Sequence, residues 1–364
     1  MTGKEPFQPK YRQIYRKLMT EIRTGRYNRS GLPGERALSE SFSCCRTTIR
    51  RALKALRQNG ILATHHGKRT QISSLSVRGL RFLWLTHTEL SRLSPARLNA
   101  YETLMEKLRE NSASLVYWRL HNQKEDTWLM EHLSEYDGII FSDVHTEKLS
   151  PFIVEKLSRF RKKVTLDSSD NQKVRNTVVC TDEYVTGRMA AEFLHRCGME
   201  RIALLGISHN LKAQYFQERV NGFINYWMEN GSGVPHELHL TLSREMDAFC
   251  AAPTAFLEKL HLRENRVQAI FLITDLTAIV CLEALKKMGF RIPEDISVMG
   301  CDNLAESAAT EPPLTTMAHP TDKIVNSIWE ILISNLGLSQ HPVNEGSTTF
   351  PPQLIQRGSV RPRS

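Results

Sequence analysis

The sequence predicts an α/β protein with two domains of unequal size. Three observations predict it. Positive charge gathers in the first 74 residues, helix-spaced apolar residues in that segment run into a short hairpin, and strand-like runs alternate with amphipathic helices over the rest. The 364 residues exceed one ordinary domain. We expect residues 1–74 to form the first domain, 75–80 a linker, and 81–364 a second domain of two α/β/α subdomains.

The charge is divided unequally along the chain. Residues 1–74 hold 16 Lys and Arg against 4 acidic residues, a balance of +12, while the remainder holds 32 against 35, a balance of −3. Arginine dominates the basic residues, and its planar guanidinium makes paired hydrogen bonds to phosphate and to guanine edges. A solvated helix face is the alternative explanation of such a segment. We favour nucleic acid as the partner.

The overall composition is that of a folded cytoplasmic protein. Hydrophobic residues make up 41% and charged residues 24%. The apolar runs are far shorter than the roughly 20 residues of a membrane helix, and the first ten residues contain no apolar signal segment. The seven cysteines have irregular spacing and no Cys-x-x-Cys pair. We therefore expect reduced thiols, no membrane contact and no metal site or other cofactor.

Apolar spacing in the first domain predicts three helices followed by a hairpin. The predicted elements are helices at 11–22, 35–42 and 46–58, and a hairpin with strands at 61–62 and 71–72. Gly60 ends the third helix, and Gly67 marks the hairpin tip. Three helices and a hairpin in this order are typical of a winged helix-turn-helix.

The helix at 46–58 carries the side chains expected to contact DNA. With its apolar residues turned inward, polar side chains of its first turns project outward: Arg46, Thr47, Thr48, Arg50 and Arg51. A recognition helix presents its N-terminal residues to base edges in the major groove. Arg36, near the start of the preceding helix, would reach a phosphate. The hairpin tip at Gly67, Lys68 and Arg69 would contact the adjoining minor groove or its backbone.

Three segments carry a family resemblance: Leu32-Pro-Gly-Glu-Arg-Ala-Leu-Ser39, Arg46-Thr-Thr-Ile-Arg-Arg-Ala-Leu53, and 56–62 with Asn59-Gly60. Through them, residues 8–72 resemble the DNA-binding domain of the GntR family. The resemblance implies that Arg36, Arg46 and Arg50 contact operator DNA and that Gly67 forms the wing tip. Two residues depart from the family pattern. Cys45 stands where a serine is usual, and Arg69 stands where a second wing glycine is common.

Strands and helices alternate through the larger domain. The predicted strands are 81–86, 115–119, 138–142, 163–167, 177–180, 201–206, 269–274 and 297–300. The predicted helices are 96–111, 127–135, 186–197, 214–230 and 276–288. Such alternation indicates parallel sheets covered by helices on both faces. Ligands of open α/β sheets bind at the carboxyl ends of the strands.

Several polar residues follow those strand ends. Asp182, Asp275 and Asp302 each follow a predicted strand, and Arg219 lies on the helix after 201–206. Carboxylates and an arginine facing a cleft suit the hydroxyl groups of a sugar. Helix capping is the alternative for any single aspartate. Their recurrence at corresponding positions favours a ligand site.

The larger domain also carries a family resemblance. Its matching segments are 181–187, 195–206, 219–223, 274–278, 289–303, 312–316 and 354–360. Through them, residues 80–360 resemble the LacI/GalR effector-binding domain, which is related in fold to periplasmic sugar-binding proteins. The resemblance implies that Asp182, Arg219, Asp275 and Asp302 line the effector cleft. It also implies that the loop with Thr88 and Ser91 closes this cleft.

The pairing of the two domains resembles one group of GntR proteins, the AraR-like arabinose repressors. Thr274 departs from the asparagine usual before Asp275, which bears on ligand choice. The arrangement implies a sugar effector. Nucleosides and phosphorylated ligands stay open as alternatives.

We therefore expect a one-component, ligand-responsive transcriptional regulator. It would act as a repressor and bind double-stranded operator DNA as a homodimer, with half-sites about one helical turn apart. The alternatives are a sugar-binding protein or a sugar-modifying enzyme with a basic accessory domain. No Gly-x-Ser-x-Gly, His-Glu-x-x-His or Walker motif occurs in the sequence, so we expect no catalytic residues. Whether the effector releases the protein from DNA or promotes its binding stays open.

Overall fold

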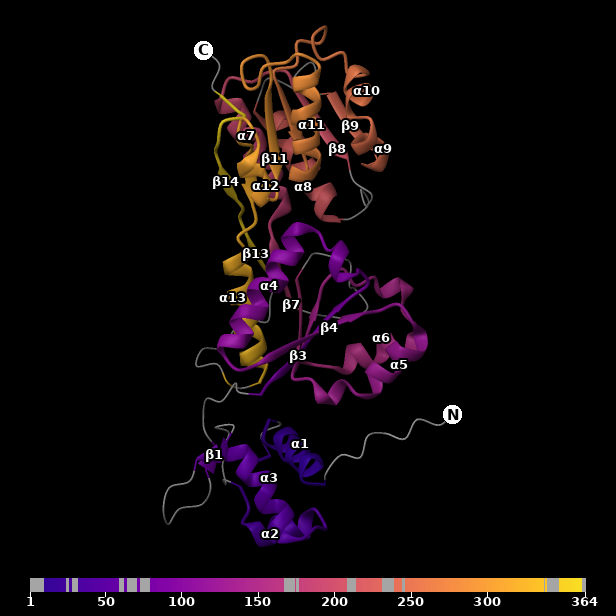
Figure 1. The fold of residues 1–364 in the computed structure, drawn as a ribbon, viewed down its shortest axis with the longest axis vertical. Coiled ribbons are helices and arrows are strands. Elements are labelled where there is room, and N and C mark those ends of the chain that lie inside the picture. The colour runs from indigo at the N-terminus through magenta and orange to yellow at the C-terminus, as the bar shows by residue number, and fades with distance from the viewer. Residues whose placement is uncertain are drawn as a thin grey trace.

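The computed structural model describes residues 10–23, 26–27, 32–58, 62–63, 71–72, 79–166, 174, 177–207, 214–230, 239–243, 246–336, 338 and 347–361. They form a small helical domain and two α/β subdomains that succeed one another along the long axis of the molecule (Figure 1). Within these residues, no helix has the length and apolar character required to cross a membrane.

The N-terminal domain packs three helices around one apolar core. Its elements are α1 (Lys10–Arg23), α2 (Glu35–Ser41), α3 (Arg46–Gln58), β1 (Leu62–Ala63) and β2 (Gln71–Ile72). The two strands are antiparallel, with Leu62 opposite Ile72. Leu18, Ile49 and Leu56 are fully buried, which turns the polar faces of the helices outward. This confirms the three predicted helices and the strand at 71–72. The strand predicted at 61–62 is found at Leu62–Ala63, and Ile61 lies outside the described residues. Gly67, Lys68 and Arg69 of the predicted hairpin tip lie outside the described residues.

The first subdomain is built on a parallel sheet of order β13-β7-β6-β5-β3-β4. Its strands are β3 (Arg81–Thr86), β4 (Ser114–Arg119), β5 (Gly138–Phe141), β6 (Lys163–Thr165), β7 (Thr177–Thr181) and β13 (Thr348–Phe350). On one face lie α4 (Pro95–Glu110) and α13 (Thr321–Asn335). On the other lie α5 (Gln123–Glu131) and α6 (Pro151–Arg159). The short 3-10 turns are η1 (Leu90–Arg92), η2 (Leu133–Glu135) and η3 (Thr146–Lys148).

The second subdomain has a sheet of order β14-β12-β11-β10-β8-β9, in which β14 is antiparallel to its neighbour. Its strands are β8 (Ile202–Ile207), β9 (His239–Ser243), β10 (Ala269–Leu272), β11 (Ser297–Cys301), β12 (Thr315–Ala318) and β14 (Gln353–Ile355). Helices α7 (Glu183–Arg196) and α8 (Gln214–Glu229) cover one face. The other face carries α9 (Met246–Ala251), α10 (Pro253–Glu258) and α11 (Asp275–Lys287), and α12 (Ala305–Ala309) follows β11.

Three described segments pass from one subdomain to the other. They join β7 to α7, β12 to α13, and β13 to β14. Figure 1 shows α13 and β13 beside the first subdomain, although both come from the C-terminal part of the chain. The chain thus crosses between the two subdomains three times within the described residues, and residues of both subdomains line a cavity between them.

The structure corrects the start of two predicted helices and adds elements that were not predicted. The helix predicted at 186–197 begins at Glu183, because Asp182 accepts the Val185 N–H and caps it. The helix predicted at 127–135 begins earlier, at Gln123, because the side chain of Asn122 accepts a hydrogen bond from the backbone N–H of Lys124 and caps it. The unpredicted α-helices and strands are α6, β9, α9, α10, α12, β12, α13, β13 and β14.

Candidate functional site

Helix α3 presents an exposed basic face. Ile49, Leu53 and Leu56 are buried against the other two helices, because they recur at helical spacing. The opposite face exposes Arg46, Thr47, Arg50 and Arg51, whereas Thr48 is half-buried. The four exposed residues thus lie on one solvent-facing surface in the N-terminal half of the helix.

The arginines of this surface differ in their intramolecular partners. Arg50 Nε lies 2.7 Å from Glu35 Oε2, and Arg36 Nε lies 3.1 Å from Glu40 Oε1. The Arg51 guanidinium lies over the ring of Tyr11, 4.6 Å from its centroid. Arg46 has no hydrogen bond or ion pair to any described residue. Exposed ion pairs of this kind contribute at most about 1 kcal/mol, so a phosphate can replace either carboxylate.

An exposed thiol lies at the N-terminal end of α3. The Cys45 carbonyl accepts the backbone N–H groups of Thr48 and Ile49, at 3.0 and 3.3 Å, and so begins the helix. Its exposed sulfur lies 3.2 Å from Thr47 Oγ1 and 3.0 Å from Thr48 Oγ1. These hydrogen bonds, that of Thr47 first, lower the pKa of Cys45 to about 7. A thiolate therefore forms at neutral pH beside the expected DNA contacts.

The second candidate site is the cleft between the two α/β subdomains. The cavity measures about 130 Å³, room for on the order of ten water molecules. The side chains that carry most of its chemistry are Arg97, Tyr215, Phe216, Arg219, Asp302 and His319. Arg97 comes from the first subdomain, and His319 lies on the segment that joins β12 to α13.

Arg219 is the central buried charge of the cleft. Its side chain is 2% exposed, and its Nε and Nη2 atoms lie 2.8 and 2.7 Å from Glu183 Oε2. Its Nη1 donates to the carbonyl of Ile273 and lies 3.8 Å from Asp302 Oδ1. Burial alone would lower the pKa of Arg219, but Cys301 and the carboxylates of Glu183 and Asp302 raise it. The guanidinium is therefore a permanent charge with fixed geometry.

Two glycines allow Arg219 to reach Glu183. A Cβ atom on Gly187 of α7 would lie 1.8 Å from the backbone oxygen of Arg219, and one on Gly222 of α8 would lie 1.9 Å from that of Tyr184. Any larger residue at either position would push the two helices apart. The close helix contact thus depends on glycine at both positions, and it places the Arg219–Glu183 pair at the wall of the cleft.

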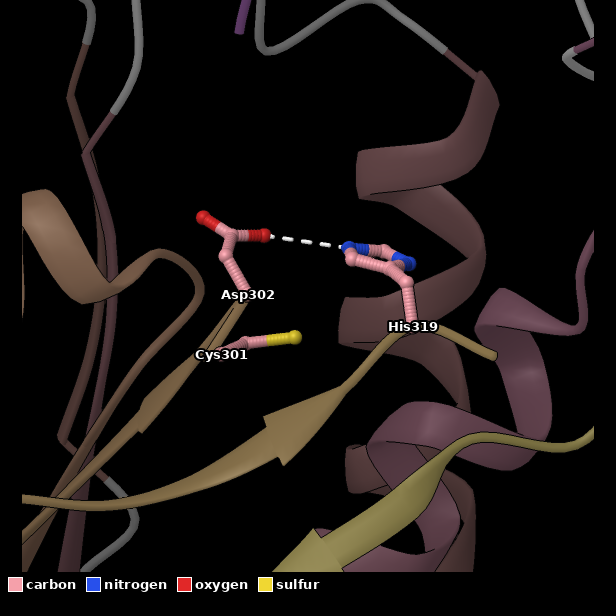
Figure 2. Close-up of side chains that lie close together, drawn as sticks. All are labelled: Cys301, Asp302 and His319. Atoms are coloured by element: carbon pink, nitrogen blue, oxygen red, sulfur yellow. Dashed lines mark hydrogen bonds and ion pairs between the residues drawn. The ribbon is translucent and has the colours of Figure 1, made fainter. Parts of the chain in front are cut away.

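His319 connects the cleft to the crossing segments. One ring nitrogen, Nδ1, lies 2.8 Å from Thr181 Oγ1, and the other, Nε2, lies 3.2 Å from Asp302 Oδ1. Figure 2 shows the Asp302 and His319 side chains facing one another above the Cys301 sulfur. Asp302 has φ = 125°, a left-handed conformation that is rare outside glycine and common at functional sites.

Asp275 lies beneath the cleft rather than at its surface. It is fully buried, and its carboxylate accepts hydrogen bonds from Ser307 Oγ and Thr316 Oγ1 at 2.6 Å each, and from the Leu304 N–H at 2.9 Å. Burial, followed by the charge of Asp302, raises the pKa of Asp275. The carboxylate therefore ties the loop after β11 to β12, directly behind Asp302.

The remaining sequence-predicted residues lie outside the cavity lining. Asp182 caps α7 by accepting the Val185 N–H at 2.9 Å. Thr88 donates to Asp143 Oδ2 at 2.5 Å, and Ser91 lies exposed in η1. Of the six residues predicted for the effector, the structure thus places Arg219 and Asp302 in the cavity wall.

Sequence reasoning missed the contact that spans the cleft. Arg97, in the first turn of α4, lies over the ring of Tyr215 on α8, 5.4 Å from its centroid. Arg97 Nη1 also lies 3.7 Å from Asp143 Oδ1. Burial would raise the pKa of Asp143, but Arg97 first, then Thr88 and two histidines, hold it below its usual value. No local sequence motif indicated a role for Arg97, because the residues that it contacts are distant in sequence.

The comparisons with known proteins agree with this architecture. Residues 10–72 match the family described as bacterial regulatory proteins, gntR family, and residues 191–360 match a periplasmic binding protein-like domain. The chain therefore joins a GntR-family winged helix-turn-helix to a LacI-type effector domain of the periplasmic-binding-protein fold. This is the domain composition of a ligand-responsive transcriptional regulator.

One relative aligns over nearly the whole chain. The arabinose metabolism transcriptional repressor of Geobacillus stearothermophilus is 26% identical over 371 residues, which cover 98% of this chain and 99% of the relative. The HTH-type transcriptional repressor PurR of Vibrio vulnificus is 30% identical over 175 residues, about half of either protein. A solved complex, transcriptional regulator CelR with cellobiose, superimposes with a TM-score of 0.62 at 20% identity and covers 86% of this chain and 90% of that one.

Proposed function

We propose that this protein is a homodimeric transcriptional repressor whose binding to operator DNA is controlled by an uncharged sugar in the cleft. The observation that carries the proposal is that both arginines of the cavity already have a carboxylate partner, Arg219 with Glu183 and Arg97 with Asp143. Tyr215 and Phe216 add the aromatic surface on which a sugar ring packs.

The pairing of both arginines separates sugars from the other candidate ligands. A phosphorylated ligand brings about two negative charges and needs cations that are not already neutralised. The Arg219 guanidinium already interacts with Glu183, Asp302 and a backbone carbonyl. We therefore assign it the role of positioning these two carboxylates, and not that of binding a phosphate. The hydroxyl groups of a sugar suit this site, because a hydroxyl can donate to the Asp302 carboxylate and can donate to or accept from the threonine hydroxyls nearby. The arabinose repressor and the CelR–cellobiose complex support a sugar as the ligand class.

The basic face of α3 supports operator DNA as the macromolecular partner. In this proposal Arg46, Thr47 and Arg50 contact base edges, and Arg36, Thr48 and Arg51 contact the backbone. Gly67, Lys68 and Arg69 would form the wing that contacts the adjoining groove. Release of counterions by these cations should make operator binding fall steeply as salt rises.

Coupling between the two sites would act through the angle between the subdomains. The cavity wall contains residues of both subdomains and of the segments that connect them, so a ligand that fills it favours one angle. In a dimer, that angle sets the separation of the two DNA-binding domains. A difference of about 1–3 kcal/mol in ligand affinity between the two states is enough for regulation.

A thermal-shift screen of neutral sugars, sugar phosphates and nucleosides tests this function. A ligand at 100 times its Kd adds about 2.7 kcal/mol to the free energy of unfolding. We expect a neutral sugar to stabilise the protein and its phosphorylated derivative not to. Asp302→Asn, which keeps the shape of the side chain and removes its charge, should reduce stabilisation by the sugar. Stabilisation by sugar phosphates alone would contradict the proposal, and conversion of the sugar would favour an enzyme.

A further inference from the structure

Three different donor atoms converge at the floor of the cleft. The Cys301 sulfur, a carboxylate oxygen of Asp302 and a ring nitrogen of His319 lie within 4.8 Å of one another (Figure 2). The shortest of these separations, Asp302 Oδ1 to His319 Nε2, is 3.2 Å. Ligands of one tetrahedral Zn²⁺ lie about 3.3–3.6 Å apart, given bond lengths of about 2.0–2.3 Å. Separations of up to 4.8 Å must therefore shorten by about 1 Å for all three atoms to bind one ion.

The backbone is shaped to bring these donors together. Adjacent residues of a regular strand point to opposite faces of the sheet, so Cys301 and Asp302 would normally diverge. Strand β11 ends at Cys301, and Asp302 takes φ = 125°. This conformation turns the carboxylate toward the imidazole that the sulfur also approaches. Non-glycine residues keep such a conformation where the surrounding structure enforces it, often at functional sites.

The imidazole is oriented as a metal ligand requires. Its Nδ1 atom lies 2.8 Å from Thr181 Oγ1, and this contact fixes the ring so that Nε2 faces Asp302. A histidine that binds a metal usually has its other ring nitrogen held by a hydrogen bond of this kind. Glu183 Oε1, 3.9 Å from the same Nδ1, adds a second polar neighbour on that side.

The local charges also balance around a divalent ion. Arg219 is the cation that could oppose it, with Nη1 at 3.8 Å from Asp302 Oδ1. The charge of Arg219 is already offset by Glu183, at 2.7 Å. The carboxylate of Asp302 and a thiolate at Cys301 then neutralise an added charge of +2.

We propose that Cys301, Asp302 and His319 bind one divalent transition-metal ion of the Zn²⁺ class at the floor of the cleft. Mixed sulfur, nitrogen and oxygen donors suit Zn²⁺ and disfavour Mg²⁺ and Ca²⁺, which prefer oxygen. On binding, the Cys301 thiol gives its proton to the solvent, and the sulfur becomes a thiolate ligand. Asp302 and His319 line the cavity, so the fourth coordination position faces it and takes water or an effector hydroxyl. Ion binding itself is independent of the proposed function, whereas the effector's place on the ion rests on it.

Titration of the metal-free, full-length protein with Co²⁺ tests the site. Co²⁺ takes the place of Zn²⁺ and reports its ligands, because a thiolate gives a charge-transfer band and tetrahedral geometry gives intense visible bands. We expect both signals in the wild type, their displacement by Zn²⁺, and loss of the charge-transfer band in Cys301→Ser. Cys180→Ser is the matched control, since this thiol lines the same cavity outside the cluster. Absence of the band in the wild type, or its survival in Cys301→Ser, would overturn the proposal.

Two further variants separate metal binding from folding. His319→Gln should abolish tetrahedral Co²⁺ binding, and it decides the question if Cys301→Ser does not fold. Thr181→Val should weaken Co²⁺ binding about 10- to 100-fold, while Thr181→Ser, which keeps the hydroxyl, restores it. Unchanged affinity in both His319→Gln and Thr181→Val would overturn the assignment. A Co²⁺ signal without sugar binding would refute the proposed effector alone, and sugar binding without a Co²⁺ signal would refute the metal site alone.

Discussion

Arg97 and Tyr215 face one another across the cleft, one from each subdomain, with the guanidinium 5.4 Å from the ring centroid. The same arginine is anchored to Asp143 in its own subdomain, at 3.7 Å. Because this contact spans the two halves, its formation depends on the angle between them. Its contribution to stability therefore changes with that angle, and we expect it to be largest when the cleft is closed around a ligand.

Replacing the ring should weaken effector binding modestly. A cation–π contact contributes about 0.5–1 kcal/mol where it is partly exposed, so Tyr215→Leu should lower sugar affinity about 2- to 5-fold. Isothermal titration calorimetry measures this directly. Tyr136→Leu is the control, since Arg81 lies over Tyr136 outside the cavity, 5.1 Å from its centroid. Equal affinity in the wild type and Tyr215→Leu would show that the ring plays no part in the closed form.

Removing the buried guanidinium should destabilise the effector domain severely. Arg219→Met leaves Glu183 buried without its cation, which costs about 3–5 kcal/mol. The double variant Arg219→Met/Glu183→Leu should recover part of this loss, because it removes the unpaired charge. Urea unfolding followed by circular dichroism measures both. The error of this measurement is about 1 kcal/mol. If the free energy of unfolding of Arg219→Met lies within that error of the wild-type value, the ion pair contributes little to stability.

The recognition helix should lose DNA affinity when its first arginine is truncated. Arg46→Ala should weaken operator binding by about 1–3 kcal/mol, roughly 5- to 150-fold, without changing ligand binding. Fluorescence anisotropy with a labelled operator duplex measures this. Arg159→Ala removes the same charge from α6 and serves as control. Equal loss in both variants would point to general electrostatics, and loss of ligand binding in Arg46→Ala would mean that its role is structural.

Cys45 should react with alkylating agents at lower pH than the other thiols. Its pKa of about 7, lowered from the ordinary value of 9.0, leaves about half of the thiol ionised near neutrality, and the thiolate is the nucleophile. The rate of iodoacetamide labelling, read by peptide mass spectrometry, should therefore rise with a midpoint near pH 7. Cys250, also exposed but with a raised pKa, supplies an internal comparison. A midpoint for Cys45 at or above that of Cys250 would contradict the hydrogen-bonded geometry at the start of α3.

The sequence predicted the local elements better than their assembly. Helical spacing located α1, α2 and α3, because each buries a continuous apolar stripe. After β11, however, the chain returns to the first subdomain in α13 and β13. The sequence of an apolar strand does not indicate which of two sheets it joins, because this depends on packing between residues far apart in sequence.

The same limit applies to the ligand site. Position after a strand pointed to Asp302, which lines the cavity, and equally to Asp275, which does not. The Asp275 carboxylate is enclosed by the Leu304 N–H and by hydroxyl groups from α12 and β12. Asp182 caps helix α7, which was the alternative explanation for any single aspartate. His319 was missed because the strand before it was not predicted. The Cys301–Asp302–His319 cluster was also missed, because its donors do not follow any metal-binding spacing.

The most direct test of the account is operator affinity measured with and without the sugar that stabilises the protein. Duplexes selected from genomic DNA by the protein itself supply the operator, and fluorescence anisotropy gives Kd at fixed salt. We predict that the sugar changes operator Kd by at least about 5-fold, the lower end of typical coupling, and that Asp302→Asn abolishes this change. An operator Kd that stays the same at saturating sugar would contradict the claim that the cleft controls the recognition helix.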